Sequence, residues 1–402
     1  MKGKRFLLCL LALLCLLTPQ ALAEKAVLRL WDIEADSAFW RTHPDIGFRR
    51  VGDLFYGDSL QTLQDARPDV ALARLYKDDW ASVTAAGLAA DLSQSPVLSE
   101  AVAGMVPWVR DLVTTEDGQI LALPLSAAPK PFTWYEDAWA EAGLTRADVP
   151  QSYAELLDFL DAWAARVRQS PEKKVCVSRL LRWSTGKERY DYTYWLMELL
   201  LQCHEMQQRY AGEPIRFDTP DFIALAQRTR DTGLALSEAE PRRSKRQKML
   251  QLFQSDLNGG EQANNGLPYG MSHAMPLRLR SDQPALHKLS VELGWIRAGS
   301  PLYDEGVRLL EYRHQTRPWT AAYALMADFP AGDYAFENGR LHHVDANWLA
   351  EYRSFEGVFV AYPLSFNQTR DGQTDKEALL TRFFSGKLSA QELAKGLDAL
   401  LP

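Results

Sequence analysis

The chain has 402 residues, with 52 acidic and 45 basic side chains, and its formal charge at pH 7 is −7. Nucleic-acid binding needs clustered Lys and Arg, so this acidic balance argues against it. The one long basic stretch, residues 242–248, is most simply a solvated helix start or loop. The length exceeds one ordinary hydrophobic core and therefore predicts two domains.

The N-terminus has the three parts of a secretory signal peptide. Lys2, Lys4 and Arg5 form a positive start, residues 6–17 form an unbroken apolar run, and a small-x-small end closes at Ala23. An uncleaved anchor is the alternative, but the run is shorter than the roughly 20 residues that span a bilayer, and a polar break follows it. We expect a secreted or periplasmic protein, cleaved after Ala23, whose charge falls to −10 when the three cations leave.

The cysteine content predicts one disulfide. Only Cys176 and Cys203 remain after cleavage, and an even pair in an oxidising compartment is typical of a disulfide. Closing a loop of about 28 residues would stabilise the fold by roughly 3–4 kcal/mol in the chain-entropy model. Two buried free thiols are the alternative. Further metal ligands at zinc spacing do not occur nearby, so no metal is expected.

The first third of the chain alternates short strands with helices. Alternating polarity at residues 27–31 and an apolar run at 68–73 predict strands, and residues 75–88 predict a helix. A polar turn at 115–119, expected as a hairpin tip, precedes a predicted strand at 120–124. This order of strand then helix is typical of an α/β fold with a mainly parallel sheet.

A proline-rich joint at residues 129–131 predicts the first crossing between domains. A strand at 132–135 and a short helix at 137–142 follow the joint. Ser152 and Glu155 then form a capping box, in which each side chain satisfies an orphan amide at the start of a helix. Apolar residues at helical spacing continue that helix.

The later elements follow from the same signals. Residues 194–210 predict a long helix, and Thr219 followed by proline predicts the start of the next one. Residues 289–296 predict a strand and residues 300–313 a helix. A second capping box at Ser389 opens the C-terminal helix.

Complete catalytic signatures do not occur in the sequence. Residues 270–274 lack the final glycine of a nucleophile elbow. Residues 204–208 have Gln where a zinc-protease helix needs its second His. Paired carboxylates for glycoside hydrolysis remain open, because their separation is a property of the tertiary structure. We therefore predict no catalytic residues and no cofactor.

Seven short motifs occur in one order along the chain, and together they resemble those of extracellular solute-binding proteins of ABC importers. The resemblance is to the sugar-type group that includes maltose-binding protein. Departures from the group include Glu136 in place of Asn and Gly306 in place of Ala, and residues 331–365 match nothing in it. The motifs are PDV at 68–70, GLAADLS at 87–93, DGQILALP at 117–124, YEDAWAEAGL at 135–144, VPQSYAELL at 149–157, a helix at 300–312 and FSGKLS at 384–389.

The resemblance implies an α/β, two-lobe, periplasmic-binding-protein-like fold of type II. Such a fold has a cleft between the lobes and a hinge of crossing strands. By this analogy residues 1–23 are the signal peptide, lobe one takes residues 24–130 and about 276–325, and lobe two takes residues 131–275 and about 326–402.

The resemblance also implies a function. Such proteins capture a small solute by lobe closure and deliver it to an ABC permease in the membrane, without making or breaking a bond. For this chain the expected solute is a sugar or oligosaccharide, and the expected state is a monomer. Peptides, polyamines or a sensory receptor remain alternatives within the same fold. A secreted carbohydrate-active enzyme is the alternative outside it.

A solute in such a cleft meets the carboxyl ends of strands and the N-termini of helices. The candidate ligand-binding residues are therefore polar or aromatic residues near predicted strand ends. Aromatic residues also fill cores, and polar ones also make turns and salt bridges, so a structural role is the alternative for each. The candidates are Trp31, Asp32, Arg74, Tyr76, Asp78, Ser126, Lys130, Trp183, Tyr190, Asn265, Tyr269 and Trp319.

Overall fold

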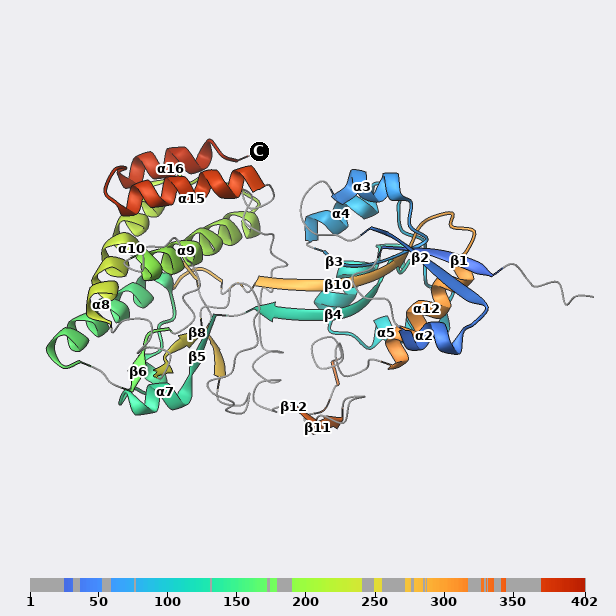
Figure 1. Cartoon of the computed structure of the whole chain (residues 1–402), viewed down its shortest axis with the longest axis horizontal. Coiled ribbons are helices and arrows are strands. Elements are labelled where there is room, and N and C mark those ends of the chain that lie inside the picture. The colour runs from blue at the N-terminus through green and yellow to red at the C-terminus, as the bar shows by residue number, and fades with distance from the viewer. Residues whose placement is uncertain are drawn as a thin grey trace, which may run out of the picture.

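The computed structural model of the protein has two lobes, which Figure 1 shows side by side. Within the helices of the described part of the chain, none is long and apolar enough to cross a membrane. The structure describes residues 25–31, 37–52, 59–75, 77–130, 132–171, 174–178, 190–240, 249–254, 272–275, 278–284, 286, 288–316, 327–328, 330, 332–335, 341–344 and 370–401.

The first lobe is built on a five-stranded sheet with the order β2-β1-β3-β10-β4. Its strands are β1 (Ala26–Trp31), β2 (Ile46–Gly52), β3 (Val70–Leu75), β4 (Leu123–Lys130) and β10 (Lys288–Ile296). β1 is parallel to β2 and β3, whereas β10 is antiparallel to both β3 and β4. The sheet is thus mixed and not mainly parallel as predicted, because β10 returns from the second lobe against the direction of β4.

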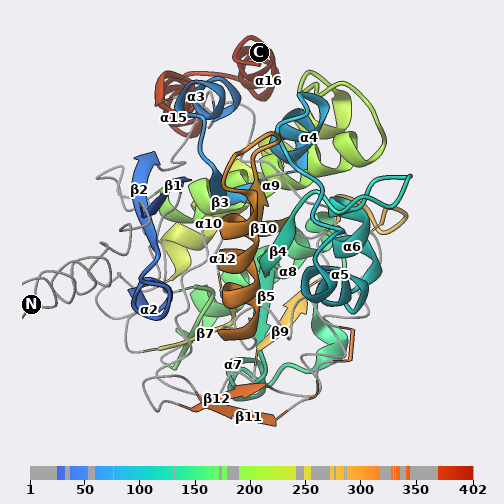
Figure 2. The same ribbon diagram turned by 90° about the vertical axis from the view of Figure 1, so that its right-hand side faces the viewer.

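Helices cover both faces of this sheet: α12 lies in front of β10 in Figure 2 and packs on Ile296, whereas Trp80 of α4 packs on the neighbouring Trp295 with ring centroids 5.5 Å apart. α12 approaches the sheet closely at Gly306, where an added Cβ would lie 3.0 Å from side-chain carbons of both Ile296 and Val70. This close packing explains the glycine that departs from the family motif. The helices of the lobe are α2 (Ser37–Thr42), α3 (Ser59–Ala66), α4 (Lys77–Ala85), α5 (Pro96–Ala103), α6 (Pro107–Val113) and α12 (Tyr303–Thr316).

The second lobe has short strands at its base and long helices above them (Figure 1). β5 (Phe132–Tyr135) lies between β8 (Phe253–Gln254) and β9 (Ser272–Met275), and β6 (Val175–Cys176) pairs in parallel with β7 (Leu250–Gln251). The remaining elements of this lobe are α7 (Glu136–Glu141), the 3-10 helix η1 (Arg146–Asp148), α8 (Tyr153–Gln169), α9 (Asp191–Tyr210), α10 (Pro220–Ala239), α15 (Arg370–Phe384) and α16 (Ala390–Asp398). The hairpin of β11 (Gly332–Ala335) and β12 (Leu341–Val344) forms a sheet of its own.

Each lobe has its own hydrophobic core. The first core gathers buried apolar side chains from residues 28–123 and 291–310. The second gathers them from residues 132–286 and 380–397. Two separate cores, each fed by two distant parts of the chain, confirm the predicted two-lobe α/β fold.

β4 and β10 join the lobes. They pair antiparallel from Leu123 opposite Gly294 to Lys130 opposite Lys288. The pairing of β3 with β10 stops at Leu75 opposite Val291. Beyond that point, among the described strands, β4 and β10 pair only with each other, as a two-stranded ribbon that leads to the second lobe (Figure 1). The predicted crossing at the proline-rich joint therefore lies at the end of this ribbon, directly before β5.

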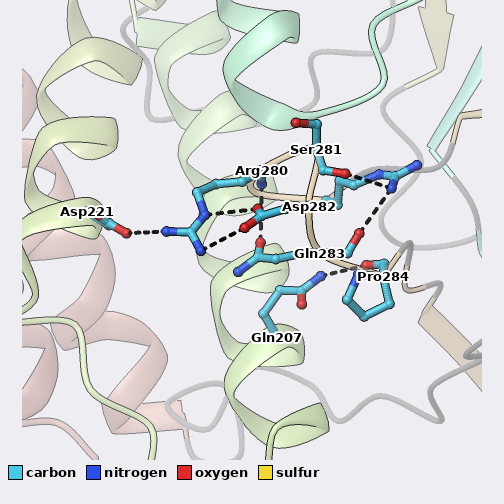
Figure 3. A network of polar contacts seen from close by, with 8 residues as sticks. Gln207, Asp221, Arg280, Ser281, Asp282, Gln283 and Pro284 are labelled. Atoms are coloured by element: carbon cyan, nitrogen blue, oxygen red, sulfur yellow. Dashed lines mark hydrogen bonds and ion pairs between the residues drawn. The ribbon is translucent and has the colours of Figure 1, made fainter.

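The segment that precedes β10 is fastened to the helices of the second lobe (Figure 3). The Arg280 guanidinium donates hydrogen bonds to Asp221 and Asp282, both at 3.2 Å. Gln207 Nε2 on α9 donates to the Pro284 carbonyl at 2.9 Å. These contacts fix the point from which the returning strand leaves the second lobe.

The predicted helix caps are present. Ser389 and Glu392 form a complete capping box at the start of α16, and the Thr219 hydroxyl accepts from the Phe222 amide at the start of α10. At α8 only half of the box forms: the Ser152 hydroxyl accepts from the Glu155 amide, but the Glu155 carboxylate accepts from the Gln151 amide one residue further back. Local sequence thus set where these helices begin.

The predicted disulfide is wrong: Cys176 and Cys203 are free, buried thiols. The amide of Val177, next to Cys176, donates to Glu240, which also accepts from the Tyr192 hydroxyl near the start of α9. Cys203 lies eleven residues after Tyr192 on α9, so the rise of 1.5 Å per residue puts it roughly 16 Å from Tyr192 along the helix axis. A disulfide needs Cα atoms within about 7 Å. Burial raises the pKa of the Cys203 thiol to about 12, so the thiol stays protonated.

Candidate functional site

Both lobes turn the carboxyl ends of strands toward the crossing. β1, β3 and β4 share one direction, so their carboxyl ends lie at the edge from which β4 leads to the second lobe. β6 and β8 run against β5, so their carboxyl ends lie where β5 begins. We call these two edges the junction edges. In open α/β sheets, ligands bind outside the carboxyl ends of strands.

Helix N-termini lie at the same edges. α2 and α4 follow the carboxyl ends of β1 and β3 in the first lobe, and α9 is the first described helix after β6 in the second. Tyr190, the residue before α9, makes no side-chain capping hydrogen bond. The first amides of a helix have no partner within the helix, which makes helix N-termini typical places for polar ligands.

Several buried polar atoms at the junction edges have no hydrogen-bond partner. In the first lobe this atom is Nε1 of Trp31, the last residue of β1. In the second lobe they are the hydroxyls of Ser178 and Thr133 and Nε1 of Trp195. Buried polar groups are nearly always hydrogen-bonded, so these four atoms need an explanation.

The position of Trp31 follows from its strand neighbours. The register of β1 with β2 shifts between Leu30 and Trp31, so Trp31 faces Gly52. A Cβ on Gly52 would lie 2.6 Å from the Trp31 ring, which means that the ring rests on the glycine backbone. The indole is 2% exposed. Only glycine leaves room for it.

The polar atoms of the second lobe surround the first residue after the crossing. The Trp195 ring on α9 packs against Phe132, with ring centroids 5.7 Å apart, and Thr133 follows in β5. The Phe253 amide donates to the Val177 carbonyl at 3.0 Å, so the strand pairing that begins in β6 extends to Ser178. Strand pairing and core packing therefore hold all three polar side chains near the start of β5.

The sheet register brings two predicted site residues into one row. Arg74 of β3 and Ser126 of β4 lie on either side of Glu292 of β10. Residues in one row of a sheet are about 5 Å apart. The row lies between the sheet centre and the junction edge.

Comparison with known proteins adds to this geometry. No protein-family model matches the sequence, and no curated protein matches it. Solved structures do match over nearly the whole chain. A binding protein of Bacillus subtilis in an open conformation has 13% identity and a TM-score of 0.58, with 93% of this chain and 96% of that chain covered.

Two further structures have similar scores. A chitin oligosaccharide binding protein has 14% identity and a TM-score of 0.55, with 94% of this chain and 98% of that chain covered. An ABC transporter solute-binding protein of Thermotoga lettingae, bound with α-D-tagatose, has 16% identity and a TM-score of 0.53, with 94% and 100% covered. The chain has the fold of the solute-binding proteins. The family resemblance of the motifs is thereby confirmed at the level of the fold.

The predicted site residues lie in three kinds of place: in a core, at a backbone position near the first junction edge, or outside the described residues. Trp31 lies at the junction edge, within the first core. Tyr190 is 4% exposed and belongs to the second core, with its ring centroid 6.1 Å from that of Phe384. For four residues the structure gives the backbone position, all at or near the first junction edge: Arg74, Asp78, Ser126 and Lys130. The other predicted residues lie outside the described residues: Asp32, Tyr76, Trp183, Asn265, Tyr269 and Trp319.

Sequence reasoning missed Ser178, Thr133, Trp195 and Glu292. Two of them had a signal. Ser178 directly follows an apolar strand, and Glu292 is the one charged residue inside the predicted strand 289–296. Thr133 and Trp195 had none, because their positions relative to the crossing depend on tertiary packing.

The junction edges combine neutral polar atoms with charged residues, since Arg74 and Glu292 lie opposite each other in the row beside the first edge. Their unpartnered atoms are hydroxyls and indole N–H groups, which keep their protons over the physiological pH range. In the described ranges no cluster of three or more His, Cys, Asp or Glu could hold a metal ion. The arrangement can therefore donate and accept hydrogen bonds to a polar solute.

Proposed function

We propose that the protein captures a small carbohydrate between its lobes and delivers it to an ABC permease. The observation that carries this proposal is the pair of junction edges with unpartnered polar atoms. A hydroxyl-rich solute entering there supplies the missing hydrogen-bond partners, each worth about 1 kcal/mol net. Apolar rings beside a few placed polar groups are typical of small-molecule sites.

The chemistry of the described atoms favours a carbohydrate over a charged solute. Sugar hydroxyls both donate and accept, which suits indole N–H groups and hydroxyls. The ligands of two structural neighbours, a chitin oligosaccharide and α-D-tagatose, belong to this class. A polyamine would need several carboxylates, whereas the row beside the first junction edge sets its one carboxylate, Glu292, opposite the cation Arg74.

We further propose that the protein binds and does not react. Its structural neighbours are binding proteins, and its sequence has no complete catalytic signature. The proposal includes export with cleavage after Ala23 and a monomeric state. It also includes the lobe boundaries given above, with one change: Leu279 and Leu286 pack in the second core, which moves the return crossing to residues 287–291.

Lobe closure would turn about the β4–β10 ribbon. The ribbon links two separate cores, and the Arg280 contacts fasten its second-lobe end (Figure 3). Hinge closure places strain on a few residues at element ends while the lobes move as rigid bodies. A solute that touches both junction edges favours the closed state, because only that state allows all its contacts.

A thermal-shift screen tests the proposal. Mature protein is unfolded and refolded to remove cargo, then heated with sugars, oligosaccharides, peptides and polyamines. A ligand at 100 times its dissociation constant stabilises by about 2.7 kcal/mol, which for a chain of this size is roughly 3 °C. A shift with a carbohydrate that is recovered unchanged supports the proposal. Breakdown of the ligand, or a shift only with peptides or polyamines, contradicts it.

A further inference from the structure

β2 leaves the first-lobe sheet with an open edge. It is the terminal strand of the order β2-β1-β3-β10-β4, and among the strands that the structure describes it pairs with β1 alone. Figure 2 shows it as the outermost labelled strand on that side of the molecule. Phe48, Arg49 and Arg50 in its middle are exposed. An exposed strand edge presents unpaired N–H and C=O groups to any extended chain that fits.

Apolar side chains are exposed along this edge. Phe48 is 42% exposed and Val27 on the neighbouring β1 is 49% exposed. The Trp40 ring of α2 stacks on Phe48 with centroids 4.5 Å apart, which holds the phenyl ring in place at the surface. Within the described residues, Tyr210 in the other lobe is the only other exposed large hydrophobic side chain. Two of the three exposed large apolar side chains in the described residues thus lie on the edge strand and its neighbour, on opposite faces of the sheet.

The edge is also cationic. Arg29 of β1 and Arg49 of β2 lie directly opposite each other, an arrangement of like charges that destabilises a sheet. Arg29 turns its guanidinium to the Ala66 carbonyl at the end of α3. Arg49 stays exposed, without an ion pair or hydrogen bond to any residue that the structure describes. The sequences of β1, β2 and α2 contain no acidic residue, although the chain as a whole has a charge of −7.

Charge selects among the chains that could pair with this edge. A second copy of β2 in antiparallel register would place Arg49, the central residue of the strand, opposite itself. That pairing repeats the repulsion already present between Arg29 and Arg49. An acidic side chain in the same position would neutralise the row. The edge therefore suits a foreign acidic chain better than a second copy.

We propose that the β2 edge binds an extended acidic segment of a partner protein as an added strand. Main-chain hydrogen bonds along β2 supply affinity, and alternate side chains supply specificity, as in other cases of strand addition. Acidic residues of the segment lie beside Arg49, and its apolar residues lie over Phe48. Phe48 and Arg49 lie in the middle of β2, whereas Gly52 at its end packs on Trp31 at the junction edge.

The test uses the mature protein and a short fluorescent peptide that alternates valine and glutamate. We expect saturable binding by fluorescence anisotropy and slower amide exchange over residues 46–52 when the peptide is present. Arg49→Glu should weaken binding at least tenfold, because it turns an attraction into a repulsion. Lys395→Glu, an equal charge change at an exposed site on α16, should leave binding unchanged.

Phe48→Ser provides a second variant, which removes apolar contact and keeps the charge. It should also weaken peptide binding, while the thermal shift with the solute stays as in the unmodified protein. Equal losses in Arg49→Glu and Lys395→Glu would overturn the proposal, because binding would then follow net charge alone. Dimerisation in sedimentation experiments that Arg49→Glu abolishes, or Arg49-dependent binding to vesicles of anionic phospholipid without peptide binding, would overturn it as well.

Discussion

The two ends of the first-lobe sheet differ in how their polar groups are satisfied. At the end away from the crossing, buried Asp69 accepts hydrogen bonds from the Arg29 amide at 2.9 Å, the Ser300 hydroxyl at 2.8 Å and the Arg297 guanidinium at 3.4 Å. At the junction edge, Trp31 Nε1 is buried with no partner. One end is closed by its own hydrogen bonds, and the other keeps a buried polar atom without a partner.

Asp91 is a second hydrogen-bonded carboxylate at the end of the sheet away from the crossing. Its carboxylate accepts from the amide and hydroxyl of Ser93 and from the Ile120 amide. Burial acts to raise the pKa of Asp91, but these hydrogen bonds outweigh it and lower the pKa. Under the proposed function, the lobe uses its far end for stability and its near end for binding, where function requires unsatisfied groups.

The largest expected effect is at the closed end. Asp69→Ala removes the acceptor that holds β1, β10 and Ser300 together and leaves several buried donors unpaired, so we expect a loss of about 3 kcal/mol in the free energy of unfolding. Urea unfolding measures it. Solute affinity should stay the same, and a large fall in affinity would show that the two ends are not separate in role.

The next effect is at the junction edge. Gly52→Ala places a methyl group 2.6 Å from the Trp31 ring, and overpacking of this kind costs about 1–3 kcal/mol. Because the ring must move, both stability and solute affinity should fall. Gly294 offers a matched control, since a Cβ there would meet Leu310 at 2.7 Å inside the core. Gly294→Ala should lower stability alone.

A smaller and more selective effect is expected at Ser178. Ser178→Ala removes a buried hydroxyl that has no partner in the protein, so the unfolding free energy of the solute-free protein should stay the same or rise. Loss of one hydrogen bond to the solute, about 1 kcal/mol, should weaken binding by roughly fivefold. Calorimetric titration measures it. Destabilisation without any change in affinity would mean that the hydroxyl has a structural role.

The smallest effect concerns pH. Burial lowers the pKa of His204 below its usual 6.5, although a hydrogen bond with the Arg216 carbonyl opposes this. The unfolded chain therefore binds this proton more readily, and stability that is present above pH 6.5 is lost as the pH falls through and below that value. His314 shifts in the same direction because of burial.

Thermal unfolding at about pH 8 and about pH 5 measures this dependence, above the range where carboxyl groups titrate. His204→Gln should reduce the difference between the two melting temperatures. Solute affinity should not follow the same profile, since the described polar atoms of the junction edges do not titrate in this range. A parallel fall in affinity would link the second lobe's helices to the binding site.

The sequence predicted those parts of the fold that local signals determine. Caps at Thr219 and Ser389 marked helix starts, and motif order indicated the two lobes. The antiparallel direction of β10 could not be read from its own residues, because it results from the return of the chain from the other lobe. The disulfide prediction failed for a similar reason: cysteine number and compartment say nothing about distance.

The candidate site was predictable to a lesser extent. Trp31, Arg74 and Ser126 were predicted because they lie near predicted strand ends, where topology places ligands, and the structure places them at or near the first junction edge. Thr133 and Trp195 were missed, since neither strand period nor helix period distinguishes a buried polar atom with a partner from one without. That difference arises only when both lobes are packed.

X-ray scattering from the mature protein, with and without the carbohydrate that gives the largest thermal shift, tests the central claim most directly. The account predicts a smaller radius of gyration when the solute is bound, because contacts to both junction edges draw the lobes together about the β4–β10 ribbon. An unchanged scattering curve at saturating solute would contradict it, since the solute would then bind without closing the lobes.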